Sequence, residues 1–225
     1  KIKKATERSE FARKGDSGRV LIVGGSEDYA GCLALAGIAA LRAGVDWVTI
    51  AAPEKVAWAI NCLSADLVTR KFKGKQFVPA HVPDVLELAK NHGTILIGNG
   101  IGKANLFVKK LVVNLLRMQK RLVIDADAIK ILSLDDLSGA IITPHAGELK
   151  EFLKNSNKNY INKNMIIEKK VKDIQSVVKD NVILIKGRYD YLVSADMILV
   201  NSTGNPGMAK AGTGDVLAGL CAGFW

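Results

Sequence analysis

The chain has 225 residues, of which 48% are hydrophobic and 24% charged, a globular composition that excludes a disordered chain or a fibrous repeat. Its net charge of +10 favours anionic partners such as nucleotides, acidic lipids or nucleic acid. No apolar stretch reaches the ~20 residues of a membrane span. Residues 1–15 are charged and do not form a secretory signal, so we expect a cytoplasmic protein.

Short apolar runs alternate with longer amphipathic segments, which predicts alternating strands and helices. In the first half we expect strands over 19–23, 47–51, 67–71 and 94–97, and helices over 31–43, 54–63, 83–91 and 103–118. Strands over 122–124 and 140–142 follow, then a helix opened by Thr143 and Pro144 and a lysine-rich helix over 162–179. A meander of three strands is expected over 182–185, 189–193 and 197–200. The last helix begins at residues 212–215 and runs to the end of the chain.

Repeated strand–helix units predict one α/β domain over residues 1–225, with a mostly parallel sheet and helices on both faces. Ligands of such sheets bind beyond the carboxyl ends of the strands. Glycines and polar residues gather after the predicted strand ends, namely Gly24, Gly25, Gly98, Gly100, Asp125, Asp127 and His145. We therefore expect a single site at that edge.

Cysteines and lysines suggest no other chemistry. The spacing of Cys32, Cys62 and Cys221 matches no metal-binding pattern, and reduced core thiols are expected. The lysine-rich helix carries an apolar stripe, so its lysines form a solvated face rather than a nucleic-acid-binding patch. The stripe consists of Ile167, Val171, Ile174 and Val178.

The most informative segment is 204–219, GNPGMAKAGTGDVLAG. Gly212 and Gly214 lack side chains, so an anion can approach the unpaired N–H groups at the start of the last helix. Asp215 would repel that anion, but it suits a base that accepts a proton from a hydroxyl attacking phosphorus. The alternative is a simple helix-entry turn with a capping acid. Beyond it, Val216, Leu217, Leu220 and Phe224 are expected to be buried.

The chain resembles the ADP/ATP-dependent NAD(P)H-hydrate dehydratase family of the ribokinase-like superfamily, through motifs that follow the family's order. They are GGSEDYAGCLALAGIAALRAG at 24–44, GNGIG at 98–102, IDADAIKIL at 124–132, TPHAGE at 143–148, KG at 186–187, GNPGMA at 204–209 and GTGD at 212–215. The resemblance implies a three-layer α/β/α sandwich. It also implies dehydration of the S epimer of hydrated NADH or NADPH, with ADP (or ATP) as the expected nucleotide and AMP and phosphate as products of ADP.

The resemblance also implies site residues. Asp215 would deprotonate the hydrate's hydroxyl, while the backbone N–H groups of Gly212, Thr213 and Gly214 would stabilise the transferred phosphoryl group. The expected nucleotide-binding residues are Gly214, Lys186, Gly187, Arg188, Tyr189 and Asp190. The hydrated dinucleotide would contact Asp215, Gly31, Cys32, Gly100 and His145. Mg²⁺ would be organised, through water, by Asp125 and Asp127.

Simpler structural roles stay open for several of these residues. Lys186 could end a strand in water, and His145 could bond to the backbone at a helix entry. Asp125 and Asp127 could serve a turn and a cap, and no catalytic role is expected for Glu148. The chain also departs from the family pattern, with Asn99 for proline, Cys32 for alanine, Lys130 for asparagine and Asp190 for threonine.

The chain starts with Lys1 and stops at Trp225 inside an apolar helix. We expect it to be processed or part of a longer protein, and fusion to an N-terminal epimerase domain is compatible with this. Because an apolar helix needs cover, a homo-oligomer is expected. The expected partners are hydrated NADH or NADPH and an adenine nucleotide, without nucleic acid or membrane. Two alternatives remain open, namely a ribokinase-like small-molecule kinase and a non-catalytic nucleotide- or nucleic-acid-binding module.

Overall fold

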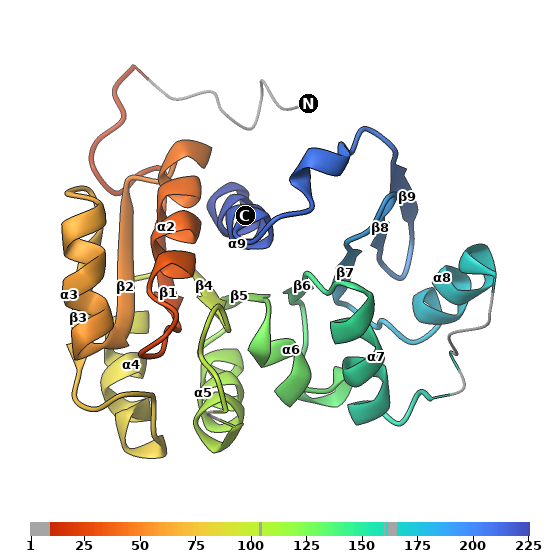
Figure 1. Ribbon diagram of the computed structural model, residues 1–225, viewed down its shortest axis with the longest axis horizontal. Helices are drawn as coiled ribbons and strands as arrows, with labels where there is room; N and C mark the ends of the chain where they lie inside the picture. Colours follow the sequence, from red (N-terminus) through yellow and green to blue (C-terminus); the bar gives the residue numbers. More distant parts are fainter. Residues whose placement is uncertain (1–9, 104, 160, 162–165) are drawn as a thin grey trace.

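The computed structural model describes residues 10–103, 105–159, 161 and 166–225, and in this part of the chain a nine-stranded sheet forms the centre (Figure 1). Its order is β3-β2-β1-β4-β5-β6-β7-β8-β9. The parallel strands are β1 (Arg19–Val23), β2 (Trp47–Pro53), β3 (Val68–Phe72), β4 (Thr94–Ile97), β5 (Arg121–Ile124), β6 (Ile141–Ile142) and β7 (Val182–Ile185). The antiparallel strands β8 (Asp190–Val193) and β9 (Ile198–Asn201) extend one edge. The predicted mostly parallel sheet and the meander are confirmed.

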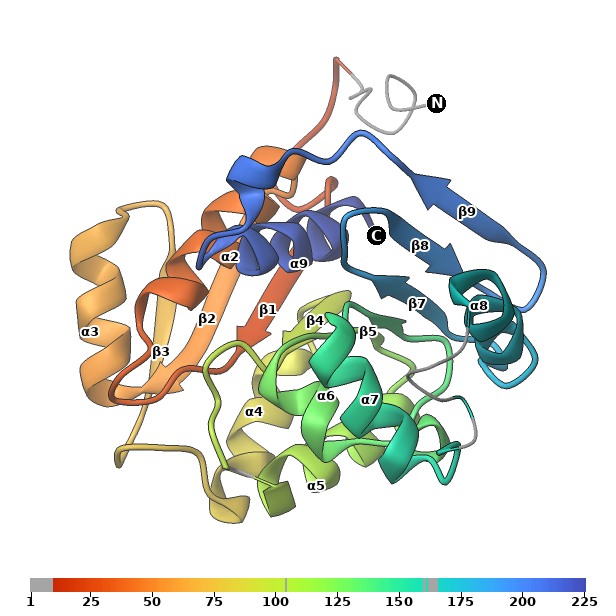
Figure 2. The same ribbon diagram turned by 45° about the vertical axis from the view of Figure 1, so that its right-hand side comes forward.

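Helices cover both faces of this sheet (Figures 1 and 2). One face packs against α2 (Gly31–Ala43), α3 (Glu54–Leu63) and α9 (Thr213–Phe224). The other packs against α4 (Val82–Ala89), α5 (Asn105–Arg117), α6 (Asp127–Ile131), α7 (Ala146–Asn155) and α8 (Ile167–Gln175). Short 3-10 turns lie at Pro79–His81, Leu134–Asp136 and Pro206–Met208. Because strand side chains alternate, Val20 and Ile22 join the first core, and Leu21 and Val23 the second. The three-layer α/β/α sandwich is confirmed.

Several details of the prediction were wrong. The cysteines are not core thiols, since Cys62 is exposed and Cys32 and Cys221 are only partly buried. The helix after β6 begins at Ala146, because His145 caps it and Thr143 and Pro144 stay outside. The lysine-rich helix is shorter than predicted, spanning Ile167–Gln175, while 162–165 lie outside the described residues. Within the predicted stripe, Ile167 is 38% exposed. The one-turn helix α6 was not predicted, since five residues are too few to show an amphipathic period.

The packing of α9 also differs from the prediction. Phe224 is 51% exposed, and Val216, Leu217 and Leu220 are only partly buried, whereas the fully buried residues are Ala218, Gly219 and Ala222. The reason is a close contact between α9 and α2 (Figure 2). A Cβ at Gly219 would lie 2.2 Å from the Ala36 carbonyl oxygen. Gly223 is likewise close to α2, since a Cβ there would lie 2.6 Å from Ala43 Cβ, so α2 packs against the glycines of α9.

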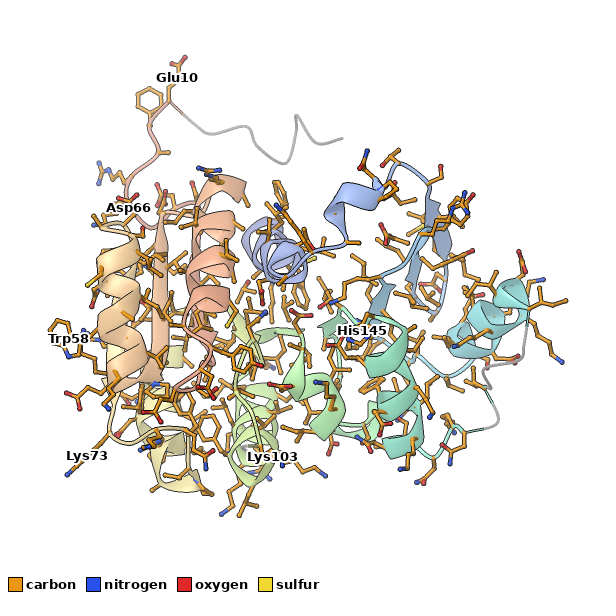
Figure 3. All side chains as sticks on the ribbon, in the orientation of Figure 1. Glu10, Trp58, Asp66, Lys73, Lys103 and His145 are labelled. Carbon is orange, nitrogen blue, oxygen red and sulfur yellow. The ribbon has the colours of Figure 1, made fainter. Side chains whose placement is uncertain are left out.

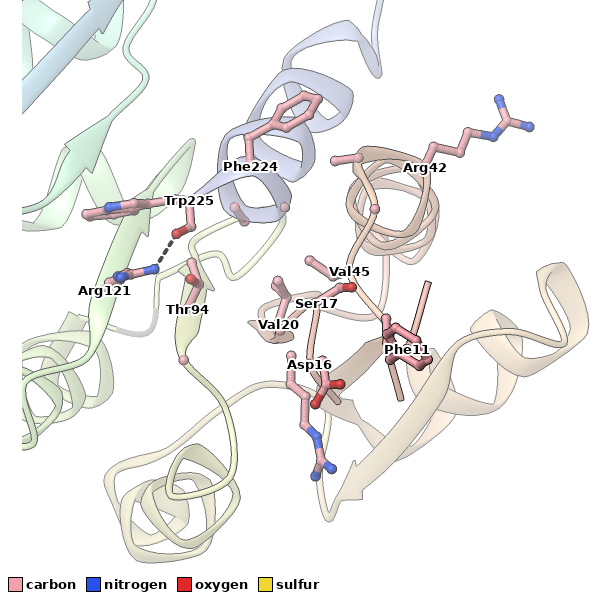
Figure 4. Close-up of a pocket in the computed structure, with 18 residues that line it drawn as sticks. Phe11, Asp16, Ser17, Val20, Arg42, Val45, Thr94, Arg121, Phe224 and Trp225 are labelled. Atoms are coloured by element: carbon pink, nitrogen blue, oxygen red, sulfur yellow. Dashed lines mark hydrogen bonds between the residues drawn. The ribbon is translucent and has the colours of Figure 1, made fainter. Parts of the chain in front are cut away.

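A cavity of about 650 Å³ lies at the amino-end edge of the sheet, opposite the expected site (Figure 4). It is lined by residues that include Arg19, Thr94, Arg121, Phe224 and Trp225, and none of the predicted site residues line it. The Arg121 guanidinium donates to the carbonyl of Trp225 there. No helix among the described residues is long and apolar enough to cross a bilayer.

Candidate functional site

The predicted residues after β4, β5, β6 and β7 meet the start of α9 at the carboxyl edge of the sheet. The carboxamide Nδ2 of Asn99 lies 2.8 Å from Asp125 Oδ2 and 2.7 Å from Asp215 Oδ1. A Cβ placed on Gly214 would lie 3.4 Å from Lys186 Nζ. Segments more than a hundred residues apart thus form one site, where the sequence predicted it.

The start of α9 forms an open cradle of backbone N–H groups. Gly212, its N-cap, has a φ of +94°, in the left-handed region that favours glycine. The Thr213 Oγ1 lies 2.8 Å from the carbonyl oxygens of both Met208 and Lys210, so its one hydroxyl hydrogen is donated to either or shared between them, and it fixes the preceding loop. Residues 212–215 are all partly exposed. Since the first N–H groups of a helix lack intrahelical acceptors, this end can receive an anion.

Asp215 is the carboxylate at the mouth of this cradle. Burial raises the pKa of its carboxyl above the ordinary value, although the hydrogen bond from Asn99 opposes that shift. The negative charge of Asp125 raises this pKa as well, and the positive charge of Lys186 lowers it. A partly buried carboxylate with a raised pKa is a better proton acceptor than a solvated one.

Asp125 is the most connected carboxylate of the site and is only 2% exposed. Its Oδ1 accepts from the Thr143 hydroxyl at 2.6 Å and from Lys186 Nζ at 3.1 Å. Lys186 Nζ also lies 3.8 Å from Glu148 Oε2, and the Glu148 side chain is 6% exposed. Lys186 is therefore held between two buried carboxylates, instead of simply ending a strand in water. Its role in nucleotide binding stays a prediction.

Replacing Lys186 with methionine is expected to destabilise the fold by about 3 kcal/mol, because the carboxylates of Asp125 and Glu148 would stay buried without their cation. Urea unfolding of the two proteins measures the difference. Lys179→Met is the matched control, since Lys179 pairs with Asp135 on the exposed surface, and it should cost less than about 1 kcal/mol. Equal losses in the two variants would contradict a buried role for Lys186.

His145 lies at the start of α7 (Figure 3). Its backbone pairs with that of Lys186 in an isolated parallel bridge. Its Nδ1 accepts from the backbone N–H groups of Gly147 and Glu148, at 3.0 and 3.4 Å. In return, Glu148 Oε2 accepts from the His145 backbone N–H at 2.9 Å. This reciprocal capping gives His145 a structural role. Its Nε2 is 3.3 Å from Glu148 Oε1, and contact with the dinucleotide stays a prediction.

Gly100 and Cys32 are neighbours. Gly100 has a φ of +63°, and a Cβ there would lie 2.9 Å from Cys32 Sγ and 2.6 Å from Tyr29 Cβ. Burial raises the pKa of the Cys32 thiol to about 12, so Cys32 is not a nucleophile at neutral pH. Nothing lies within 4 Å of a Cβ placed on Gly31. Open space therefore lies beside Gly31 but not beside Gly100, and contact of these residues with substrate stays a prediction.

The remaining predicted residues shape turns. Asp190 Oδ1 accepts from the Gly187 N–H at 3.1 Å and so closes the turn between β7 and β8, where Arg188 and Tyr189 are exposed. Asp127 Oδ2 accepts from the Gly102 N–H at 3.0 Å, and its Oδ1 pairs with Lys130 Nζ at 2.9 Å. The nucleotide and magnesium roles of these residues stay predictions.

Sequence reasoning gave no role in the site to Asn99, Thr143 or Glu148. Asn99 was noted only as a departure from the family's proline, and Glu148 was expected to have no catalytic role. A usable signal existed for Asn99 and Thr143, because each lies within two residues of the end of a buried parallel strand, at the ligand edge of the sheet. What the sequence could not supply was the partner of each side chain.

Comparison with known proteins identifies the family to which the chain is similar. A family model described as NAD(P)H-hydrate dehydratase matches residues 20–225. The chain is 39% identical over 223 residues to a bifunctional NAD(P)H-hydrate repair enzyme of Pyrobaculum aerophilum, covering 97% of this chain and 43% of that protein. It is 33% identical over 228 residues to an ADP-dependent (S)-NAD(P)H-hydrate dehydratase of Cenarchaeum symbiosum, covering 96% of this chain and 76% of that protein. The chain thus spans less than half the length of the first of these relatives.

Solved structures share the fold. A ribokinase-like superfamily protein from Enterococcus faecalis has a TM-score of 0.80 at 23% identity, covering 97% of this chain and 74% of that one. The ADP/ATP-dependent NAD(P)H-hydrate dehydratase of Bacillus subtilis, co-crystallised with ATP and Mg²⁺, has a TM-score of 0.75 at 23% identity, covering 99% and 79%. At these identities the likeness establishes the ribokinase-like fold alone.

Proposed function

The chain belongs to the NAD(P)H-hydrate dehydratase family, and we propose that it dehydrates the S epimer of hydrated NADH or NADPH while ADP is converted to AMP and phosphate. One observation carries the proposal. The Asp215 carboxylate lies in the first turn of α9, next to the backbone N–H groups of the partly exposed residues 212–214. A base therefore lies beside a site that can bind an oxyanion. That pairing suits transfer of a phosphoryl group to a hydroxyl.

The reaction needs activation because hydroxide is a poor leaving group. Asp215 accepts the proton of the ring hydroxyl as its oxygen bonds to the terminal phosphorus of ADP. The bond from that phosphorus to the bridging oxygen breaks, and AMP is released. The N–H groups of Gly212, Thr213 and Gly214 stabilise the charge on the transferred group. Phosphate then leaves with the carbon–oxygen bonding pair, a proton leaves the adjacent ring carbon, and the double bond is restored.

The side chains fit a magnesium ion that is held mainly by nucleotide phosphates. The described residues contain no cluster of three or more histidine, cysteine or acidic side chains able to hold a metal by themselves. Asp127 is partly exposed and would orient water around such an ion, whereas Asp125 is buried and would act through the groups that it already holds. When bound, Mg²⁺ neutralises charge on the phosphates. Lys186 contributes a further positive charge at the same edge.

The nucleotide dependence tests this function. The protein is incubated with the S epimer of hydrated NADH alone, with ADP or with ATP, and the absorbance of the restored dihydronicotinamide is followed. Recovery with ADP and none without nucleotide is the expected result. Phosphorylation of a stable alcohol without dehydration would point to a kinase instead. Nucleotide binding without any turnover would point to a non-catalytic module.

Three further properties belong to the proposal. Relatives named as bifunctional repair enzymes are more than twice as long as the region they share with this chain, which supports a partner epimerase domain. The partly exposed apolar side chains of α9 support a homo-oligomer, testable by light scattering of the purified chain. A cytoplasmic location fits the expected substrate, a hydrated cofactor of central metabolism.

A further inference from the structure

Asn99 occupies an unusual place in the site. It lies two residues after the end of β4, and it is completely buried. Its single Nδ2 amino group donates one hydrogen to Asp125 Oδ2 at 2.8 Å and the other to Asp215 Oδ1 at 2.7 Å. One side chain therefore joins the buried, cation-paired carboxylate of β5 to the partly exposed carboxylate of α9.

The orientation of this carboxamide follows from its neighbours. Turning it over would place Oδ1, which can only accept, against two carboxylates. In the orientation that satisfies Asp125 and Asp215, Oδ1 is buried and finds no donor in the part of the chain that the structure describes. An unpaired buried acceptor costs about 1–3 kcal/mol. The two carboxylates therefore decide the orientation of this carboxamide, and the bridge between them is its main polar contact.

The backbone around Asn99 keeps the bridge in place. The Gly25 N–H donates to the Asn99 carbonyl oxygen at 2.8 Å. A Cβ on Gly24 would lie 2.4 Å from that same oxygen, so β1 approaches this loop as closely as a glycine permits. Asp125, the other end of the bridge, is held by Thr143 and Lys186. Asp215 is thus tied, through Asn99, to a buried carboxylate that Thr143 and Lys186 hold in place.

We propose that Asn99 is a positioning residue, whose amino group ties Asp215 to Asp125 and so holds the proton-accepting carboxylate at the mouth of the amide cradle. The inference rests on the proposed function, because it assigns Asn99 to the base of that reaction. Asn99 touches no reacting atom and acts through Asp215. A carboxylate displaced by about 1 Å loses on the order of 10²-fold in rate.

The test compares two substitutions of similar size. Asn99→Leu removes both donors, and Asn99→Asp replaces them with acceptors that face two carboxylates. We expect kcat to fall about 10²-fold in Asn99→Leu and further in Asn99→Asp, with the KM for ADP within about threefold of wild type. Since Asn99 acts through Asp215, adding Asn99→Leu to Asp215→Asn should lower kcat by less than about twofold more.

Asn181→Leu is the matched control. Asn181 is 1% exposed, accepts from the Ala140 N–H and donates to the Val178 carbonyl, all away from the site. Its loss should lower the melting temperature and leave kcat of the folded protein unchanged. If Asn99→Leu does not fold, Asn99→Ser, which retains one donor, replaces it with an expected intermediate kcat.

The outcomes separate the two proposals. Wild-type kcat in a folded Asn99→Leu protein would overturn the bridge and leave the proposed function standing. A tenfold or greater additional loss in the double variant would show that Asn99 acts independently of Asp215, and it would also overturn the bridge. A wild-type protein that fails to dehydrate the hydrate with ADP or ATP would overturn the function, and with it the role of Asn99.

Discussion

Replacing Asp215 with asparagine is expected to lower the rate of ADP-driven dehydration by about 10³-fold, the scale of a lost general base. Asparagine has nearly the same shape and still reaches Asn99, but it cannot accept the proton of the substrate hydroxyl. The N–H cradle at 212–214 is unchanged, so ADP binding measured by calorimetry should stay within a few fold of wild type. A variant that retains a tenth of the wild-type rate would contradict the proposed base.

The same substitution should make the protein more stable at neutral pH. The pKa of Asp215 in the folded state is raised, mainly by burial, so ionisation of this carboxyl opposes folding. Protonated Asp215 contributes fully to stability below the pKa that its carboxyl has in the unfolded chain. This contribution is lost as pH rises through the higher pKa of the folded state. In urea unfolding, the free energy of unfolding of Asp215→Asn should therefore increase relative to that of wild type as pH rises from about 4 to 7.

The pH dependence of the rate should have the opposite sign to that of stability. Only ionised Asp215 accepts a proton, so activity is expected to rise with pH through the raised pKa. Asp66→Asn is the control, since Asp66 is exposed in the loop before β3 and should change neither profile. A lower stability of Asp215→Asn at neutral pH would contradict the burial argument.

Gly98→Ala is expected to produce the largest loss of stability, more than about 3 kcal/mol. Gly98 directly follows β4 and has a φ of +128°, a backbone conformation that disfavours any side chain. A Cβ there would lie 1.9 Å from the Asp125 carbonyl oxygen and 2.7 Å from Ala128 Cβ. Because the nearest atom belongs to the backbone, β4 and β5 would have to separate where Asn99 and Asp125 meet.

Alanine substitutions at two other glycines near β4 distinguish the two causes of that loss, steric clash and backbone strain. Gly102→Ala places a Cβ at a φ of +67° with nothing within 4 Å, so it should cost about 1 kcal/mol for conformation alone. At Gly93 an added Cβ has no atom within 4 Å and φ is not positive, so the free energy of unfolding of Gly93→Ala should stay within about 1 kcal/mol of wild type. Urea unfolding at neutral pH measures all three. A Gly98→Ala protein as stable as Gly102→Ala would show that β4 and β5 can move apart freely.

The strand and helix order was accessible from the sequence because it depends on local periodicity. β1, β4 and β7 and helices α2 and α3 begin and end at the predicted residues. The errors arose where local pattern is weak. In α9, hydrophobicity favoured burial of Phe224, but close approach to Ala36 required the glycine and alanine face instead. Whether the side chains of two helices fit together depends on both helices, so the sequence of α9 alone could not predict this packing.

The sequence by itself determined the fold class, the family and the edge of the sheet where the site lies, because strand periodicity and motif order are carried by neighbouring residues. Only the tertiary structure decided which groups touch there. Asn99 and Asp215 are 116 residues apart in the chain, and Lys186 is 61 residues from Asp125. Hydrogen bonds form over about 3 Å, and contacts at that distance depend on how the layers pack.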